Sequence, residues 1–345
     1  MDSTIALILI QDGIVNGAIY ALISMALVLV FAVTRVIFIP QGEFVTFGAL
    51  TLAMLVNGIV PGTVWLLLAV GIAVCVVEAV GAVRSKSWRG FPRVLVSCLI
   101  YPAMMAWLVH ALPRKELPLA VNVLLSLALV VPLGPMIYRL AYQRLAEASV
   151  LVLLIASVAV HFALTGAGLL FFGAEGWRTP PFVSGSINLG FTTISAQTIF
   201  VVVTAIVLIC ILFLLFEKTL YGRALRATAV NRRGARLMGI STTTSGAITF
   251  TLAAFIGAFS GVLIAPVTTI YYDTGFLIGL KGFVGAIFGG LSSYPIAAAG
   301  SVFVGLLEAF GSFWASAFKE VIVFTVIIPV LLWLSLTHAH AEDEE

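Results

Sequence analysis

Residues 196–267 read AQTIFVVVTAIVLICILFLLFEKTLYGRALRATAVNRRGARLMGISTTTSGAITFTLAAFIGAFSGVLIAPV, two apolar runs separated by one basic stretch. Each run is close to the length of about 20 apolar residues that a helix needs to cross a bilayer. The stretch between them, 217–242, carries six Lys or Arg residues against one acid, Glu217. Because Lys and Arg accumulate in cytoplasmic loops, this pattern predicts two membrane spans joined by a long cytoplasmic loop, 218–245.

The same apolar pattern extends over the whole 345-residue chain. Mean hydropathy is +1.17 and only 10% of the residues are charged, far outside the usage of water-soluble domains. The apolar segments do not show the alternation of apolar and polar residues that is typical of strands. We therefore expect an all-α polytopic integral membrane protein with about 8–11 transmembrane or re-entrant helices. The expected spans are 5–33, 36–57, 61–83, 94–111, 118–138, 149–173, 196–217, 246–267, 278–298, 298–316 and 319–337. Pro, Gly or charge interrupts 36–57 and 278–298, which are expected to be half-helices.

The positive charges alternate along the chain. Basic clusters at 84–93, 139–144 and 218–236 are separated by the nearly uncharged connections 58–62 and 174–195. Placing the basic clusters inside gives a consistent alternating path. We therefore expect a multi-pass protein of the bacterial inner membrane with these loops in the cytoplasm.

Several classes of activity have no support in the sequence. G-x-x-x-x-G-K-[ST], H-E-x-x-H and G-x-S-x-G are all absent, so the chain is expected to be no enzyme and to bind no nucleotide cofactor or catalytic metal. Its three Cys residues lie singly in apolar runs, and His110 and His161 are expected to lie alone near span ends. Residues 338–345 form a polar acidic tail. Nothing predicts a nucleic-acid partner.

The basic loop is expected to bind a soluble partner. Residues from Arg223 to Gly239 are predicted to form one short helix, whose small residues Ala227 and Ala235 would let a partner approach closely. The alternative is that its charge only orients the chain in the membrane. The candidate docking residues are Gly222, Arg223, Arg226, Ala227, Asn231, Arg232, Ala235, Leu237 and Gly239.

Charged residues inside apolar spans are costly and point to a role. Arg35 and Glu43 flank a turn with Pro40, Gln41 and Gly42, where a backbone break could form a gate or line a pathway. The alternative is an interfacial turn whose Arg35 reaches lipid phosphate. Glu308 could line the pathway, or pair structurally with Lys281 or Lys319.

A run of glycines marks the segment GLKGFVGAIFGG. Gly282, Gly285 and Gly289 are spaced by three and four residues, which places them on one helical face. Such a face favours close packing against another span. A substrate groove along the exposed backbone is the alternative.

Three stretches resemble the branched-chain amino acid permease family of ABC importers, specifically its LivH-type subunit. They are NGAIYALISMALVLVFAVTRVIFIPQGEFVTFGAL (16–50), GRALRATAVNRRGARLMGI (222–240), and GLKGFVGAIFGGLSSYP (279–295) with GLLEAFGSFW and FKEVIVFTVIIPVLLW following. The chain departs from the family pattern at 38–42 and at Arg233–Gly234, and 84–117 is expected to be an extra hydrophobic insertion.

The resemblance implies a single permease domain over 1–345, with an acid at position 308. It implies import of branched-chain or other hydrophobic amino acids delivered by a periplasmic binding protein. The expected partners are a second, LivM-like permease subunit and two cytoplasmic ATPase subunits, which bind ATP and Mg and dock on the basic loop. Import of urea or short amides is the substrate alternative. An ion-coupled secondary transporter is the alternative from another class, but no internal repeat supports it.

Overall fold

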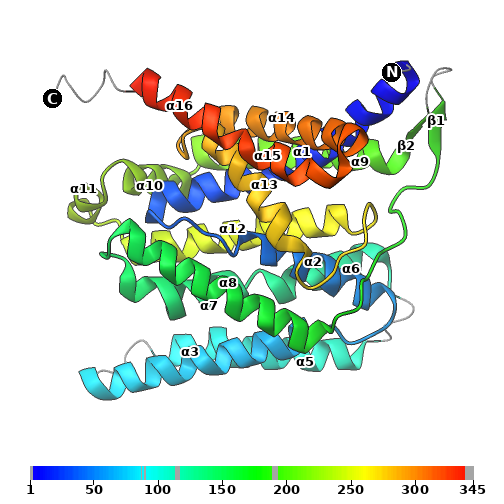
Figure 1. Ribbon diagram of the computed structural model, residues 1–345. Coiled ribbons are helices and arrows are strands. Elements are labelled where there is room, and N and C mark those ends of the chain that lie inside the picture. The colour runs from blue at the N-terminus through cyan, green and yellow to red at the C-terminus, as the bar shows by residue number, and fades with distance from the viewer. Residues whose placement is uncertain (1–2, 87, 89–90, 113–116, 189–192, 339–345) are drawn as a thin grey trace.

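The computed structural model describes residues 3–86, 88, 91–112, 117–188 and 193–338, and it is almost entirely helical (Figure 1). The described residues include nine helices long and apolar enough to cross a membrane, within the predicted range. The two shorter apolar helices, α2 and α13, lie where half-helices were predicted. The prediction of an all-α polytopic architecture is confirmed.

The element bounds follow the expected spans closely. The helices are α1 (Ser3–Thr34), α2 (Gln41–Val56), α3 (Thr63–Ser85), α4 (Phe91–Leu95), η1 (Val96–Ile100), α5 (Tyr101–Ala111), α6 (Leu119–Val130), α7 (Leu133–Ile137), η3 (Tyr138–Tyr142), η4 (Gln143–Leu145), α8 (Val150–Phe172), α9 (Ala196–Lys218), α10 (Leu220–Val230), α11 (Arg232–Leu237), α12 (Thr242–Ile264), α13 (Thr274–Phe288), α14 (Tyr294–Trp314), η5 (Ser316–Phe318), α15 (Lys319–Thr325) and α16 (Ile327–His338). Strands β1 (Ser186–Asn188) and β2 (Thr193–Ser195) form an antiparallel hairpin in which Ser186 faces Ser195.

Helix α1 is the centre of the bundle. In its most apolar window 89% of the residues are buried, against α9, α12, α13 and α14. Glycines allow the closest approach, because a Cβ on Gly17 would lie 2.7 Å from the Val302 Cα of α14. A Cβ on Gly13 would lie 2.8 Å from the Leu306 Cα. Small residues at such contacts let two membrane helices pack backbone to backbone.

After α1 the chain turns back into the protein without a helix. Arg35 adopts the left-handed conformation (φ 61°), and residues 35–40 are non-helical until α2 begins at Gln41. Val36 and Phe38 on this segment are buried. Non-helical backbone at membrane depth is tolerated where protein surrounds it. The structure thus places the predicted backbone break at residues 35–40.

The first turns of α2 and α13 touch through their backbones. A Cβ on Gly42 would lie 1.9 Å from the carbonyl oxygen of Gly275, and one on Gly275 would lie 2.1 Å from that of Gly42. Neither position can carry a side chain in this arrangement. The N-terminal ends of the two half-helices therefore meet inside the bundle.

The predicted glycine face of α13 serves packing. A Cβ on Gly282 would meet Ile23 of α1 at 2.5 Å, and one on Gly285 would meet Ser301 of α14 at 2.0 Å. A Cβ on Gly289 would lie 2.4 Å from the carbonyl oxygen of Ser293. Because these residues lie against other parts of the protein, the structure supports the packing interpretation.

Segment 84–117 lies at the edge of the bundle. Its helices α4, η1 and α5 together form one span that packs on α3 (Figure 1), and the Tyr101 hydroxyl donates to the Ala128 carbonyl of α6 at 2.8 Å. This peripheral place fits an insertion, which stays a prediction. The polar turn 113–116, Arg89 and the tail residues 339–345 lie outside the described residues.

The two ends of the bundle differ in character. Helices α10 and α11 lie at one end, together with the last turns of α3 and α16, and the β1–β2 hairpin lies at the other (Figure 1). At the hairpin end, Trp177 and Ile270 exchange two backbone hydrogen bonds of 2.9 Å that join two loops. The basic loop is thus separated from the hairpin by the length of the spans.

Candidate functional site

A buried polar centre is built where α2, α8 and α13 converge. Glu43 lies in the first turn of α2, and its Oε1 atom is 2.5 Å from the Nδ1 atom of His161 in α8. The side chains of Glu43 and His161 are only 3% and 8% exposed. The Thr165 hydroxyl, one turn further along α8, lies 3.5 Å from the same carboxylate oxygen. The Phe276 ring of α13 stacks on the imidazole with ring centroids 4.4 Å apart. We call Glu43, His161, Thr165 and Phe276 the polar centre.

His161 is the residue that the sequence analysis misjudged. The expectation that it lies alone near a span end is wrong, because it lies in the middle of α8 and pairs with a carboxylate 118 residues earlier. Its spacing of four residues from Thr165, on an otherwise apolar helix, was the available signal. His110 does lie near a helix end, where its Nδ1 contacts the Ala106 carbonyl one turn back.

The polar centre retains unused hydrogen-bonding capacity. Glu43 Oε2, Gln41 Oε1 and Thr46 Oγ1 are buried and have no hydrogen-bond partner among the described residues. The Gln41 amide nitrogen, by contrast, donates to the Ala253 carbonyl at 3.0 Å. Buried oxygen atoms without partners are costly unless a donor reaches them. The arrangement can therefore accept hydrogen bonds from a water or from a donor group of a ligand.

A second set of buried charges lies around Glu308. Its two carboxylate oxygens contact Lys281 Nζ of α13 and the Tyr20 hydroxyl of α1, each at 2.5 Å, and Lys281 also lies 3.1 Å from Glu320 of α15. We call Tyr20, Lys281, Glu308 and Glu320 the ionic cluster. Of the two predicted partners, Lys281 is the one observed, and Lys319 instead lies 3.9 Å from Glu320. Both oxygens of Glu308 are thus engaged inside the protein.

Arg35 is separated from the other pathway candidates. The structure brings Gln41, Gly42 and Glu43 to the start of α2, whereas Arg35 lines a pocket of about 510 Å³ with Arg232, Arg233 and Arg236. Its guanidinium carbon lies 5.8 Å from the centre of the Phe31 ring. The structure therefore places Arg35 apart from Glu43, with the mostly buried segment 36–40 between them, and a gate or pathway role for either residue stays a prediction.

The basic loop contains two helices rather than one. Asn231 has extended backbone angles (φ −147°, ψ 100°) and ends α10, and its side chain accepts a 2.8 Å hydrogen bond from Gly234 N at the start of α11. An Asn at an N-cap explains the break, because it satisfies a backbone donor that the new helix leaves free. The expected single helix from Arg223 to Gly239 is wrong in this respect. Gly239, at φ 82°, follows the end of α11.

The docking candidates divide between the two sides of these helices. Gly222 and Ala235 face inward, and a Cβ on Gly222 would lie 2.3 Å from the Leu215 carbonyl oxygen. Ala227 is exposed. A partner can therefore approach Ala227, but the expectation that it also contacts Ala235 is wrong, because that side chain is covered by the chain itself.

Most arginines of the loop tie it to the rest of the protein. Arg226 contacts Glu217 at 2.6 Å, Arg236 contacts Glu147 at 2.9 Å, and Arg232 donates to the Ala146 carbonyl at 3.0 Å. The hydrogen bond from Arg236 lowers the pKa of the exposed Glu147 carboxyl. Arg223 and Arg233 point outward as expected.

The outward surface of the loop is also strongly apolar, which the sequence analysis missed except at Leu237. Five large side chains on α10, α11 and the turns beside them are 70–88% exposed although they lie outside the apolar spans. We call them the loop platform: Leu220, Tyr221, Val230, Leu237 and Met238. The available signal was that large apolar residues stand at both ends of α10, at Leu220, Tyr221 and Val230, outside the inward positions Gly222, Leu225 and Thr228.

Comparisons with known proteins agree with this architecture. The model of the family described as branched-chain amino acid transport system permease component matches residues 98–331. The chain is 28% identical over 289 residues to the high-affinity branched-chain amino acid transport system permease protein BraD of Pseudomonas aeruginosa, covering 82% of this chain and 93% of BraD. It is 26% identical over 290 residues to the Escherichia coli K12 permease protein LivH, covering 81% and 92%.

A relative from a third organism is similar over a shorter stretch. The chain is 28% identical over 235 residues to a probable branched-chain amino acid transport permease protein LivH of Methanocaldococcus jannaschii, covering 65% of this chain and 71% of that one. No solved structure matches the chain. With its family model matched over more than half its length and its membrane-spanning helices in place, the chain belongs to the permease component family of branched-chain amino acid transport systems.

Proposed function

We propose that this chain is the membrane-spanning subunit of an ATP-driven importer for branched-chain or other hydrophobic amino acids. A periplasmic binding protein delivers the amino acid, and a second permease subunit completes the pore. Two ATPase subunits in the cytoplasm bind ATP and Mg and supply the driving force. Support for the substrate class comes from the relatives, whose names describe branched-chain amino acid transport.

The loop platform is the observation that supports coupling of this chain to the ATPase subunits. Large apolar side chains exposed beyond the ends of the spans mark a surface that a protein partner covers. Arg223 and Arg233 are exposed beside these side chains, and they could pair with acidic or polar residues at the rim of the partner's contact surface. Because α10 and α11 are anchored inward through Gly222, Ala235 and the arginine contacts, a movement of the platform would be transmitted to α9 and α12.

The polar centre supports the transport role of the chain. The half-helices α2 and α13 begin inside the bundle beside Glu43, and broken helices are where membrane transporters form polar sites at bilayer depth. The free Oε2 of Glu43 can accept a hydrogen bond from an ammonium group or from an amide NH₂. Urea or a short amide therefore remains the substrate alternative, which uptake assays with labelled leucine and labelled urea distinguish.

Ala227→Glu tests the coupling role. The added charge and volume would enter a packed interface, so co-purification of the ATPase subunits and substrate-stimulated ATP hydrolysis are expected to fall at least about tenfold. The control is Ser184→Glu, which adds the same charge to an exposed residue near the hairpin at the other end of the bundle. Membrane insertion should be unchanged in both variants.

Two outcomes would contradict the proposal. Unchanged ATPase association in Ala227→Glu would mean that the basic loop only orients the chain in the membrane. Uptake by this chain alone in liposomes, driven by a proton or sodium gradient, would favour the ion-coupled secondary transporter.

A further inference from the structure

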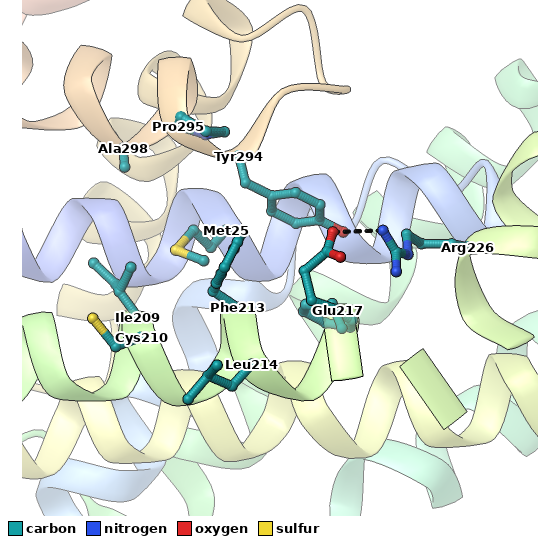
Figure 2. Close-up of a pocket in the computed structure, with 11 residues that line it drawn as sticks. Met25, Ile209, Cys210, Phe213, Leu214, Glu217, Arg226, Tyr294, Pro295 and Ala298 are labelled. Carbon is teal, nitrogen blue, oxygen red and sulfur yellow. Dashed lines mark hydrogen bonds and ion pairs between the residues drawn. The ribbon is translucent and has the colours of Figure 1, made fainter. Parts of the chain in front are cut away.

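An apolar groove runs between α9 and α14, with α1 behind it (Figure 2). Its volume is about 540 Å³, and its apolar wall includes Met25 of α1, Cys210 and Phe213 of α9, and Ala298 of α14. Residues 209–217 of α9 follow it over about two helical turns, roughly 12 Å. That length is close to the hydrocarbon depth of one leaflet, about 15 Å.

One end of the groove is charged. Glu217 and Arg226, which contact each other at 2.6 Å, lie there beside the ring of Tyr294 (Figure 2). Both charged side chains are almost half exposed, and α9 ends at the next residue, Lys218. The apolar part of the groove therefore lies along the span, and its charged pair lies where the span ends, at the depth of lipid headgroups.

We propose that this groove binds one phospholipid whose headgroup carries both a phosphate and a primary ammonium. An acyl chain of the lipid lies in the groove against its apolar wall. In the headgroup, the phosphate accepts hydrogen bonds from Arg226, and the ammonium donates one to Glu217. The opposite charges are already adjacent in the protein, so a zwitterionic headgroup satisfies both, whereas an anionic headgroup leaves Glu217 facing negative charge.

The position of the groove favours lipid over the transported substrate. Its lining comes from α1, α9, α10 and α14, and includes no residue of α2, α8 or α13, which build the polar centre. An apolar groove that opens along a span contains hydrocarbon unless protein covers it. The lipid would bridge α9 and α14 to α10, which carries part of the loop platform.

Native mass spectrometry of the purified, delipidated permease complex tests the proposal. Phosphatidylethanolamine is expected to bind at least about fivefold more tightly than phosphatidylglycerol, which lacks the ammonium, or phosphatidylcholine, whose ammonium cannot donate a hydrogen bond. Glu217→Gln should remove the preference over phosphatidylglycerol. Arg226→Gln should weaken binding of all three lipids. Equal binding of the three lipids by the unchanged protein would overturn the headgroup assignment.

A matched pair of substitutions tests the groove itself. Ala298→Phe fills it and should abolish retention of the lipid, whereas Ala299→Phe places the same ring on the exposed neighbouring position and should have no effect. Equal retention by the two variants would contradict the proposal.

The native Cys210 thiol gives a second readout that needs no change in the groove. Cys210 is an exposed free cysteine, so phosphatidylethanolamine should slow its reaction with N-ethylmaleimide by at least about fivefold. A cross-link from Cys210 to the second permease subunit, with no lipid retained, would show a protein interface instead and would reject the lipid.

Discussion

The buried polar sites and the loop platform show opposite relations to their surroundings. In the ionic cluster, Lys281 and Glu308 are almost fully buried and use one another as partners. On the loop platform, Leu220 and Leu237 are large and apolar, yet 79% and 88% exposed. Lys281 and Glu308 have each other as partners within the chain. The loop platform presents large apolar side chains that no described residue covers.

Because of this difference, substitutions in the two regions should affect different properties of the protein. A change in the buried sites leaves a charge or a polar group without its partner, so it should affect the stability of the subunit and the transport step. A change at the platform leaves the folded chain intact, so it should affect assembly.

Lys281→Met should destabilise the protein most. It leaves the buried Glu308 without its cation, and breaking a buried pair in this way costs about 3–5 kcal/mol. The expected result is a large loss of purified subunit and a lower Tm in detergent. Adding Glu308→Gln should recover part of the loss, because the carboxylate is then neutral.

Lys319→Met is the control for this effect. Lys319 is 41% exposed and lies 3.9 Å from Glu320, so its loss should change little. Equal damage from Lys281→Met and Lys319→Met would mean that burial of the ionic cluster does not determine its importance.

Glu43→Gln should reduce transport more than stability. The substitution keeps the shape of the side chain but removes the charge that His161 contacts, and a hydrogen bond to a charged group is worth about 1.5–3 kcal/mol. ATP-dependent uptake in proteoliposomes should fall at least about tenfold while the complex still assembles. The exposed Glu175→Gln serves as the control. Normal uptake by Glu43→Gln would remove the polar centre from the mechanism.

Glu147→Gln should have the smallest effect. Arg236 lowers the pKa of Glu147 by a hydrogen bond, so any stabilisation from this pair is present at neutral pH and is lost as pH falls through the lowered pKa. Because Glu147 is fully exposed, we expect the Tm of the variant to match that of the unchanged protein from neutral to mildly acidic pH. A clearly lower Tm of the variant at neutral pH alone would show that the Glu147–Arg236 pair holds the loop in place.

The spans could be predicted from the sequence because each depends on local composition. All eleven expected segments contain helices, and the interruptions at Pro40 and among the glycines of α13 correctly marked the two short ones. Pairing across the bundle could not be predicted in the same way. The contact between Glu43 and His161 joins residues 118 positions apart, and no spacing pattern in a single sequence encodes it.

The loop was harder to predict than the spans. Its charge is visible in composition, but the exposure of Leu220 and Val230 depends on which face of α10 packs inward. Asn231 was chosen as a docking residue, while its capping interaction with Gly234 is local and could have been predicted. The alanines on both sides of Asn231 favour one continuous helix, whereas the Asn231 cap divides the loop into α10 and α11.

The packing of α1 against α14 has a consequence for biosynthesis. Helix α1 contacts α14, a helix that is synthesised much later, and the Tyr20–Glu308 hydrogen bond joins residues 288 positions apart. At about 5–20 residues per second, translation needs on the order of half a minute to supply that partner. During this interval Gly13 and Gly17 face the translocon or lipid, without the backbone that they later contact. A chain arrested before Tyr294 therefore holds its central helix in the membrane with one side uncovered, available to quality-control proteases.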